Sequence, residues 1–208
     1  VGNSNQSVGV LAASDLVIPQ NPPQVPTVFS GNITWFQPDA SLFLASAGWL
    51  DDRLLAIGSG TFGQPSQINL LDTNSSPSTP DRPLIINNVQ GANGGIVFDV
   101  ANNLYVGNGF ANGNGSSTGD IKRFEFADWD VARTGAPLDF EDANNPPITT
   151  ILSAGRLHFD TDGSLIVGGG DNFTVSGEDN FLAMVDLSGA NRPRRQFDPD
   201  TGAADNAY

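Results

Sequence analysis

Apolar residues in this chain occur in short runs between turns, and this spacing predicts β-strands. Runs such as 95–98, 104–107 and 164–167 are rich in Ile, Val, Leu and Phe, whereas Gly, Asn, Asp and Pro fill the intervals between runs. β-Branched and aromatic residues bounded by turn formers are typical of strands. The single helical candidate, 126–133, is short. The pattern therefore predicts an all-β protein.

Two parts of the chain resemble each other at a fixed interval. Asp99 aligns with Asp160, an offset of 61 residues, and the same offset aligns 121–126 with 182–187 without a gap. Agreement on both sides of variable loops is hard to obtain by chance. Self-similarity at a fixed period indicates a repeat architecture.

A third, shorter copy precedes these two, because residues 46–48 match 153–155 and 53–60 resembles 164–170. Each copy resolves into four strands, and a tight turn of the Asp162-Gly163 kind joins the first two. The predicted strands are about 47–50, 53–60, 66–72 and 83–89 in the first copy, about 94–100, 103–109, 119–126 and 148–152 in the second, and about 156–160, 164–170, 181–187 and 194–198 in the third.

Four-stranded units in series predict a β-propeller-like array of antiparallel blades, with about 3.5–4 blades in this chain. Residues 1–45 are predicted to hold N-terminal strands and a Pro-rich connector as a partial blade. Residues 46–208 are predicted to hold three blades, at about 46–90, 94–152 and 153–199, and a C-terminal tail. Three interpretations are open: a small four-bladed ring, half of a ring that a partner chain closes, or, favoured by the missing leader, a piece of a longer protein.

Composition excludes several classes of function. Acidic residues outnumber basic ones by 23 to 9, which gives a net charge of −14 and argues against binding nucleic acid. Cysteine is absent and His158 is the single histidine, so zinc sites built on thiolates or several imidazoles are excluded. No apolar run approaches the roughly 18 residues that a membrane span needs, so we expect no membrane insertion. His158 is predicted to be a packed core residue rather than a catalyst.

Two Asp-rich segments, 160–163 and 198–205, resemble the opening of calcium loops. In such loops alternate carboxylates converge on one ion beside a glycine. Neither segment carries the distal Glu of an EF-hand. Asp99 and Asp160 also recur at the end of the first strand of their repeats, where the alternative is that each carboxylate caps its own turn. The candidate Ca²⁺ ligands are Asp99, Asp160, Asp162, Asp198, Asp200 and Asp205.

The repeat unit Phe-Asp-x-(Asp/Ala)-(Gly/Asn)-x-Leu-(Tyr/Ile)-Val-Gly resembles the blade signature of NHL-type and SMP-30/gluconolactonase-like β-propellers, over residues 46–199. The resemblance implies a metal in a central channel, held by Asp99 and Asp160 with Asn102, Asn108 or Asn172 as companions. It also implies hydrolysis of the lactonase type. The metal-ligand Glu of that family has no evident counterpart in this chain.

Our leading hypothesis is a secreted, extracellular or periplasmic scaffold without catalytic activity, whose loops bind a protein or carbohydrate partner. The alternative is a metal-dependent lactonase. A third hypothesis is self-association, or completion of the propeller by another chain or segment. The only basic cluster, 192–195, is predicted to be a solvated edge strand, with docking of an acidic partner as the alternative.

Overall fold

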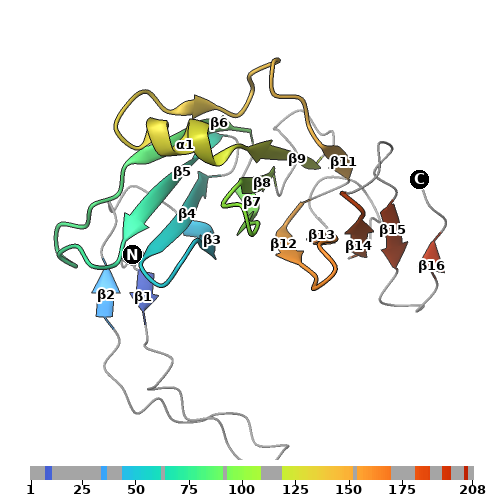
Figure 1. The fold of residues 1–208 in the computed structure, drawn as a ribbon, viewed down its shortest axis with the longest axis horizontal. Coiled ribbons are helices and arrows are strands. Elements are labelled where there is room, and N and C mark those ends of the chain that lie inside the picture. Colours follow the sequence, from blue (N-terminus) through green and yellow to red (C-terminus); the bar gives the residue numbers. More distant parts are fainter. Residues whose placement is uncertain are drawn as a thin grey trace, which may run out of the picture.

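The computed structural model of the 208-residue chain describes residues 8–10, 34–36, 44–61, 64–90, 93–108, 119–151, 154–169, 181–187, 194–197 and 204–205. These residues form strands β1 to β16 and one helix, α1. The all-β prediction is confirmed, and the strands form successive blade-like sheets (Figure 1).

The first blade-like sheet follows the predicted four-stranded pattern, and each strand pairs antiparallel with the next. A fifth strand joins its outer edge parallel to β6, which the sequence did not indicate because two residues are too few to show alternation. The strands are β3 (Leu44–Trp49), β4 (Leu54–Thr61), β5 (Gln64–Asp72), β6 (Leu84–Val89) and β10 (Leu138–Asp139).

The second and third sheets repeat this meander, and their strands lie where the sequence predicts them. The second sheet consists of β7 (Asn93–Phe98), β8 (Leu104–Asn108), β9 (Gly119–Phe124) and β11 (Thr149–Ile151). The third consists of β12 (Arg156–Phe159), β13 (Leu165–Gly169), β14 (Phe181–Val185), β15 (Arg194–Phe197) and the short β16 (Ala204–Asp205).

The pairing registers preserve the repeat offset of the sequence. Tyr105 lies opposite Arg123 in the second sheet, and the residues 61 positions later, Ile166 and Met184, lie opposite each other in the third. Because side chains alternate between the two faces of a strand, equal registers place equivalent residues on equivalent faces. The offset therefore identifies matching positions in the two blades.

The three sheets succeed one another in an arc, with their first strands side by side (Figure 1). Glycine permits this approach, because a Cβ on Gly48 would lie 2.5 Å from the carbonyl oxygen of Ile96. A Cβ on Gly95 would lie 2.3 Å from the backbone nitrogen of Leu157. The Gly95 N–H also donates to the carbonyl of Ala154 at 2.7 Å. Blades are thus joined backbone to backbone along their inner strands.

Two apolar cores fill the spaces between consecutive sheets. The alternation of β8 divides its side chains between them, because Leu104 and Val106 face the first sheet whereas Tyr105 faces the third. The first core joins Ala56, Ile68, Leu70, Ile85, Ile86 and Val89 to Ile96, Leu104, Val106 and Phe124. The second core joins Tyr105, Ile121 and Ile151 to Leu165, Val167, Ala183 and Val185.

The N-terminal strands β1 (Val8–Val10) and β2 (Thr34–Phe36) form a separate antiparallel pair. Phe36 is almost completely buried and packs with Leu55, Ile57 and Leu71, on the face of the first sheet that points away from the second. The strand pair therefore covers the first end of the array. The predicted Pro-rich connector, 15–31, lies outside the described residues.

Helix α1 (Phe126–Ala132) lies between β9 and β11 and confirms the predicted helical segment. It buries Trp129 and Ala132 in the core between the first two sheets, so it ties the two blades together. Among the described residues, no helix is long and apolar enough to cross a membrane.

Candidate binding surface

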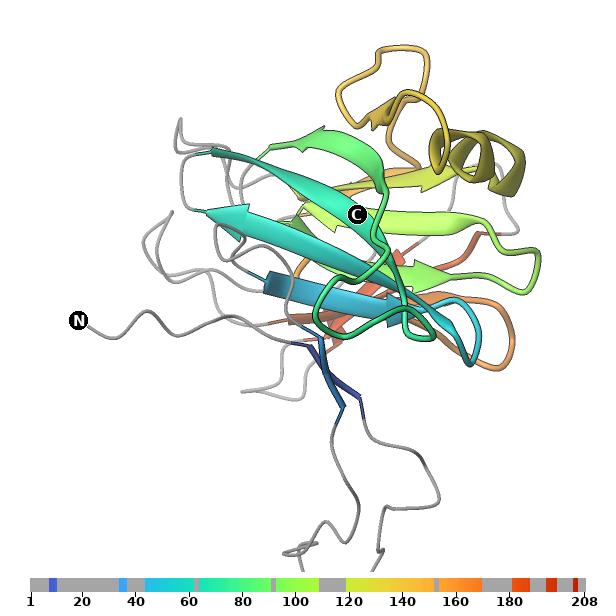
Figure 2. The ribbon, with the colours of Figure 1, turned by 90° about the vertical axis from the view of Figure 1, so that its left-hand side faces the viewer.

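The turns that follow β3, β7 and β12 lie on the same side of the array, on the right of Figure 2. Each turn is held by one or two of its own carboxylates. Oδ1 of Asp51 accepts hydrogen bonds from the backbone N–H groups of Arg53 and Leu54, at 2.8 and 2.6 Å. In the next turn, Oδ1 of Asp99 accepts from Ala101 and Asn103, both at 2.9 Å. These contacts confirm turn capping for Asp99.

The turn after β12 uses the same chemistry. Oδ1 of Asp160 accepts from the backbone N–H of Thr161 at 2.7 Å, and Oδ1 of Asp162 accepts from that of Ser164 at 2.8 Å. Gly163 has a φ of +86°, a conformation that glycine adopts without strain. The Asp-Gly pair that resembled a calcium loop thus builds a hairpin turn.

The second carboxylate oxygen of Asp99 is also engaged, because it accepts from Nδ2 of Asn103 at 2.8 Å and lies 3.4 Å from the hydroxyl of Tyr105. In the part of the chain that the structure describes, no three His, Asp or Glu side chains are grouped so that they could hold a metal. Asn102 lies in this turn, whereas Asn108 ends β8, about 16 Å further along the strand. Asn108 therefore does not share a site with Asp99.

Calcium binding by the six predicted ligands stays a prediction. Asp198 and Asp200 lie outside the described residues, as does the companion Asn172, and Asp205 belongs to β16, whose side chains are not described. Calcium binding by this segment is therefore neither confirmed nor contradicted.

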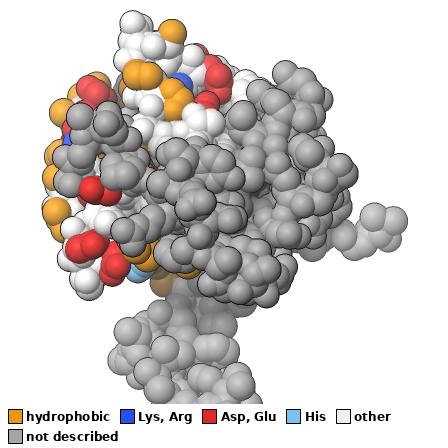
Figure 3. Space-filling model, turned by 90° about the vertical axis from the view of Figure 1, so that its right-hand side faces the viewer, with side chains coloured by type: hydrophobic (Ala, Val, Ile, Leu, Met, Phe, Trp, Pro, Cys, Tyr) orange, Lys and Arg blue, Asp and Glu red, His pale blue; other side chains and the backbone are white. Residues whose placement is uncertain are grey.

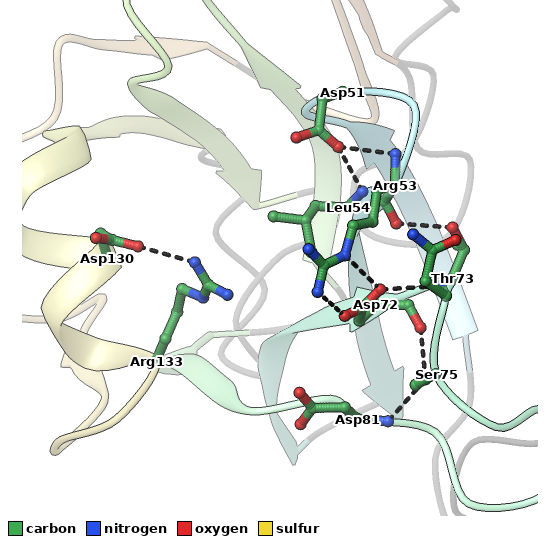
Figure 4. Close-up of polar contacts among 10 residues, drawn as sticks. Asp51, Arg53, Leu54, Asp72, Thr73, Ser75, Asp81, Asp130 and Arg133 are labelled. Atoms are coloured by element: carbon green, nitrogen blue, oxygen red, sulfur yellow. Dashed lines mark hydrogen bonds and ion pairs between the residues drawn. The ribbon is translucent and has the colours of Figure 1, made fainter.

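An ion pair connects the turn after β3 to the end of β5 (Figure 4). The Arg53 guanidinium forms a bidentate contact with the Asp72 carboxylate, in which Nε lies 2.8 Å from Oδ1. The Asp72 carboxylate also accepts from the backbone N–H of Asn74, and the carbonyl of Arg53 accepts from Thr73. Donation by Arg53 lowers the pKa of Asp72 below its ordinary value, and Arg133 on α1 lowers it further against the opposing effect of burial.

This lowered pKa predicts a specific loss of stability in acid. At pH values between the folded and unfolded pKa of Asp72, the unfolded state binds more protons than the folded state. The stabilisation that the Arg53–Asp72 ion pair provides is therefore present above about pH 5 and disappears as the pH falls through the folded pKa. We expect Asp72→Asn to flatten the decline in the free energy of unfolding below about pH 4. Urea titrations at several pH values measure the slope. Asp52→Asn, an exposed carboxyl outside the Arg53 contact, should keep the wild-type slope.

Large apolar side chains are exposed beside these polar turns. Trp49, the last residue of β3, is 47% exposed, and Val100 stands fully exposed in the turn after β7. Phe126 and Val131 on α1 are exposed to 41% and 69%. We define the turn surface as eight exposed apolar and acidic residues at the end of β3, in the three turns and on α1: Trp49, Asp51, Asp52, Val100, Phe126, Asp128, Val131 and Asp162.

Helix α1 is fixed to the turn after β7 by two hydrogen bonds. The backbone N–H of Phe126 donates to Oδ1 of Asn103 at 3.1 Å, and Nε1 of Trp129 donates to the carbonyl of Asn102 at 2.9 Å. The Trp129 ring also meets the rings of Phe98 and Phe126 edge to face. The exposed apolar groups of the turn surface therefore stand on a held backbone, which lowers the entropic cost of binding a partner.

The charge of the turn surface is predominantly negative. Its exposed residues include the carboxylates of Asp51, Asp52, Asp128 and Asp162. Arg53 is half exposed and is neutralised by Asp72. Figure 3 views the molecule from the side of the third sheet, where red and orange side chains both occur among the described residues that are visible. Exposed apolar side chains and carboxylates on the same side of the array are suited to a partner that is both apolar and cationic.

One prediction about a side chain was wrong. His158 is exposed on β12, whereas its neighbours Leu157 and Phe159 pack partly into the second core. The sequence correctly predicted that His158 points to the opposite face of β12 from Leu157 and Phe159. It wrongly predicted that this face is buried, because the next blade partly covers the equivalent residue Val97 but His158 is exposed.

Comparison with known proteins gives a structural likeness to a β-propeller domain. The WD40 β-propeller domain of Doa1 matches over 81% of this chain, with 13% sequence identity and a TM-score of 0.40. The matched part is 55% of that chain, so this protein spans about half the length of that structure. No protein-family model matches the sequence, and no curated protein does. The more specific resemblance to NHL-type and SMP-30/gluconolactonase-like propellers stays a prediction.

The residues that sequence reasoning missed are the exposed apolar ones. Val100 carried a usable signal, because it is a β-branched residue inside a turn of Asp, Ala and Asn, where packing does not require it. Trp49 and Phe126 carried none, because both lie at the ends of apolar runs that also supply the core.

Proposed function

We propose that this chain is a binding module without catalytic activity, and that its turn surface contacts a partner protein. The observation that carries the proposal is the set of exposed apolar side chains, Trp49, Val100, Phe126 and Val131, among carboxylates on capped turns and an anchored helix. Exposed apolar patches with a polar rim are characteristic of protein-interaction sites. A location outside the cell and stabilisation by calcium remain separate expectations.

The lactonase alternative receives no support from the described residues. The two recurring carboxylates that would hold its metal accept hydrogen bonds from their own turns. The exposed histidine lies on the outer face of the third sheet, away from Asp99. A binding module therefore accounts for more of the geometry than a hydrolase does.

Binding of a synthetic peptide of alternating Lys and Leu residues tests the proposal. We expect saturable binding that weakens with salt, because exposed charges are screened. Trp49→Ala and Asp52→Asn should each weaken binding about five- to tenfold, measured by fluorescence anisotropy of the labelled peptide. A peptide with Glu in place of Lys should not bind.

Two variants serve as matched controls for that experiment. Leu182→Ala removes an apolar side chain with the same 47% exposure as Trp49, but from the third sheet. Glu141→Gln removes one exposed charge at the outer edge of the first sheet. Both should bind the peptide as the wild type does when the protein is dilute enough to be monomeric. Equal losses in the control and test variants would contradict a site at the turn surface.

A further inference from the structure

The third sheet presents an outer face whose equivalent in the second sheet is an interface. The repeat offset maps Tyr105 to Ile166 and Ile121 to Leu182. Tyr105 and Ile121 are buried against the third sheet, at 5% and 0% exposure, whereas Leu182 is 47% exposed. The face that the second sheet buries against the third is thus repeated on the outer side of the third sheet. This outer face continues an established series of interfaces.

Another blade packed in the same manner does not fit this face. Between the first three blades the inner strands approach at Gly48 and Gly95, where a Cβ would collide with the next backbone. The position equivalent to Gly95 in the third sheet is Arg156, whose side chain is exposed. An inner strand cannot approach Arg156 as closely as Leu157 approaches Gly95. The occupant must therefore accommodate a cationic group beside the apolar residues.

An exposed arginine lies beside apolar residues on this face of an otherwise acidic chain. Arg156 and His158 are exposed on β12, and Ile166 and Met184 follow in register across the sheet. The face thus combines apolar residues with positive charge, which is complementary to the apolar and acidic turn surface.

We propose that the outer face of the third sheet binds the turn surface of a second copy of this chain. The inference rests on the proposed function, because it names a partner for the turn surface. Leu182, Ile166 and Met184 meet the apolar residues of the turn surface, and Arg156 faces its carboxylates. The two surfaces are different, so the contact is heterologous. A dimer therefore retains one free turn surface and one free outer face.

Mass measurements on two complementary variants test this contact. A face variant, Arg156→Glu with Leu182→Ser, keeps the turn surface, and a turn variant, Trp49→Ser with Asp52→Lys, keeps the face. We expect the average mass of the wild type to rise with concentration in analytical ultracentrifugation, and each variant alone to associate at least about tenfold more weakly. An equimolar mixture of the variants should give a 1:1 dimer that does not grow.

The alternatives give different results in the same experiment. A wild type that stays monomeric up to about 1 mM overturns the inference, because weaker contacts than this are not specific. A turn variant that dimerises alone also overturns it, because that result requires a face-to-face contact. Thermal melts show whether each variant is folded, and Glu141→Gln should associate as the wild type does. If the Lys/Leu peptide still binds to a strictly monomeric protein, the proposed function stands without the inference.

Discussion

Gly107→Ala is expected to destabilise the protein by about 3 kcal/mol, because the added methyl group has no space. A Cβ on Gly107 would lie 2.5 Å from the Cβ of Ala154 and 2.7 Å from its carbonyl oxygen. Ala154 lies between β11 and β12 and donates its N–H to the carbonyl of Asn108 at 3.1 Å. Relief of the collision must therefore move backbone that joins the second and third blades. Urea unfolding of the variant measures the loss.

The repeat supplies a matched control for this substitution. Gly168 lies 61 residues after Gly107 at the equivalent position of the third sheet, but a Cβ there would lie 3.6 Å from that of Arg156, an ordinary contact. Gly168→Ala should change the free energy of unfolding by less than about 0.5 kcal/mol, or raise it, because alanine reduces the entropy of the unfolded chain. Equal effects of the two substitutions would contradict the described packing of the blades.

Trp129→Ala is expected to cost about 4 kcal/mol, because it empties the largest buried site between the first two blades. The indole is completely buried, meets the rings of Phe98 and Phe126, and donates to the carbonyl of Asn102. Loss of this side chain should also release α1 from the turn after β7. Unfolding in guanidinium chloride measures the first effect, and peptide binding at the turn surface measures the second.

Two further substitutions separate packing from hydrogen bonding at this site. Trp129→Phe keeps much of the ring but leaves the Asn102 carbonyl without its donor, so we expect a loss of about 1–2 kcal/mol. Val131→Ala lies on the same helix at an exposed position and should be nearly neutral for stability. A neutral Trp129→Ala would contradict the role of α1 as the connection between the blades.

Much of the fold could be predicted from the sequence because the repeat supplied the alignment that single strands lack. Once Asp99 was matched with Asp160, one offset placed equivalent strands in two sheets, and the pairing registers of the structure preserve that offset. The strands β10 and β16 could not be predicted, because each is two residues long and forms by pairing with a neighbour rather than by its own pattern.

The candidate site was harder to predict, because Asp serves turns and metals with the same atoms. Asp162-Gly163 is a hairpin signal and also the opening of a calcium loop, and the hydrogen bond that Asp162 accepts from Ser164 shows the first use. The burial of individual side chains was also difficult to predict. Whether Trp49 and His158 are buried depends on which blade faces them, and this is a tertiary property that alternation along one strand does not contain.

The most direct test of the turn surface is an amide NMR titration of the ¹⁵N-labelled protein with the Lys/Leu peptide. The account predicts that the largest shift changes occur in the turns at 50–53 and 99–103 and in helix α1, with little change at the outer edge of the first sheet, 138–146. Shift changes centred on that edge, or none at saturating peptide, would contradict the assignment of binding to the turn surface.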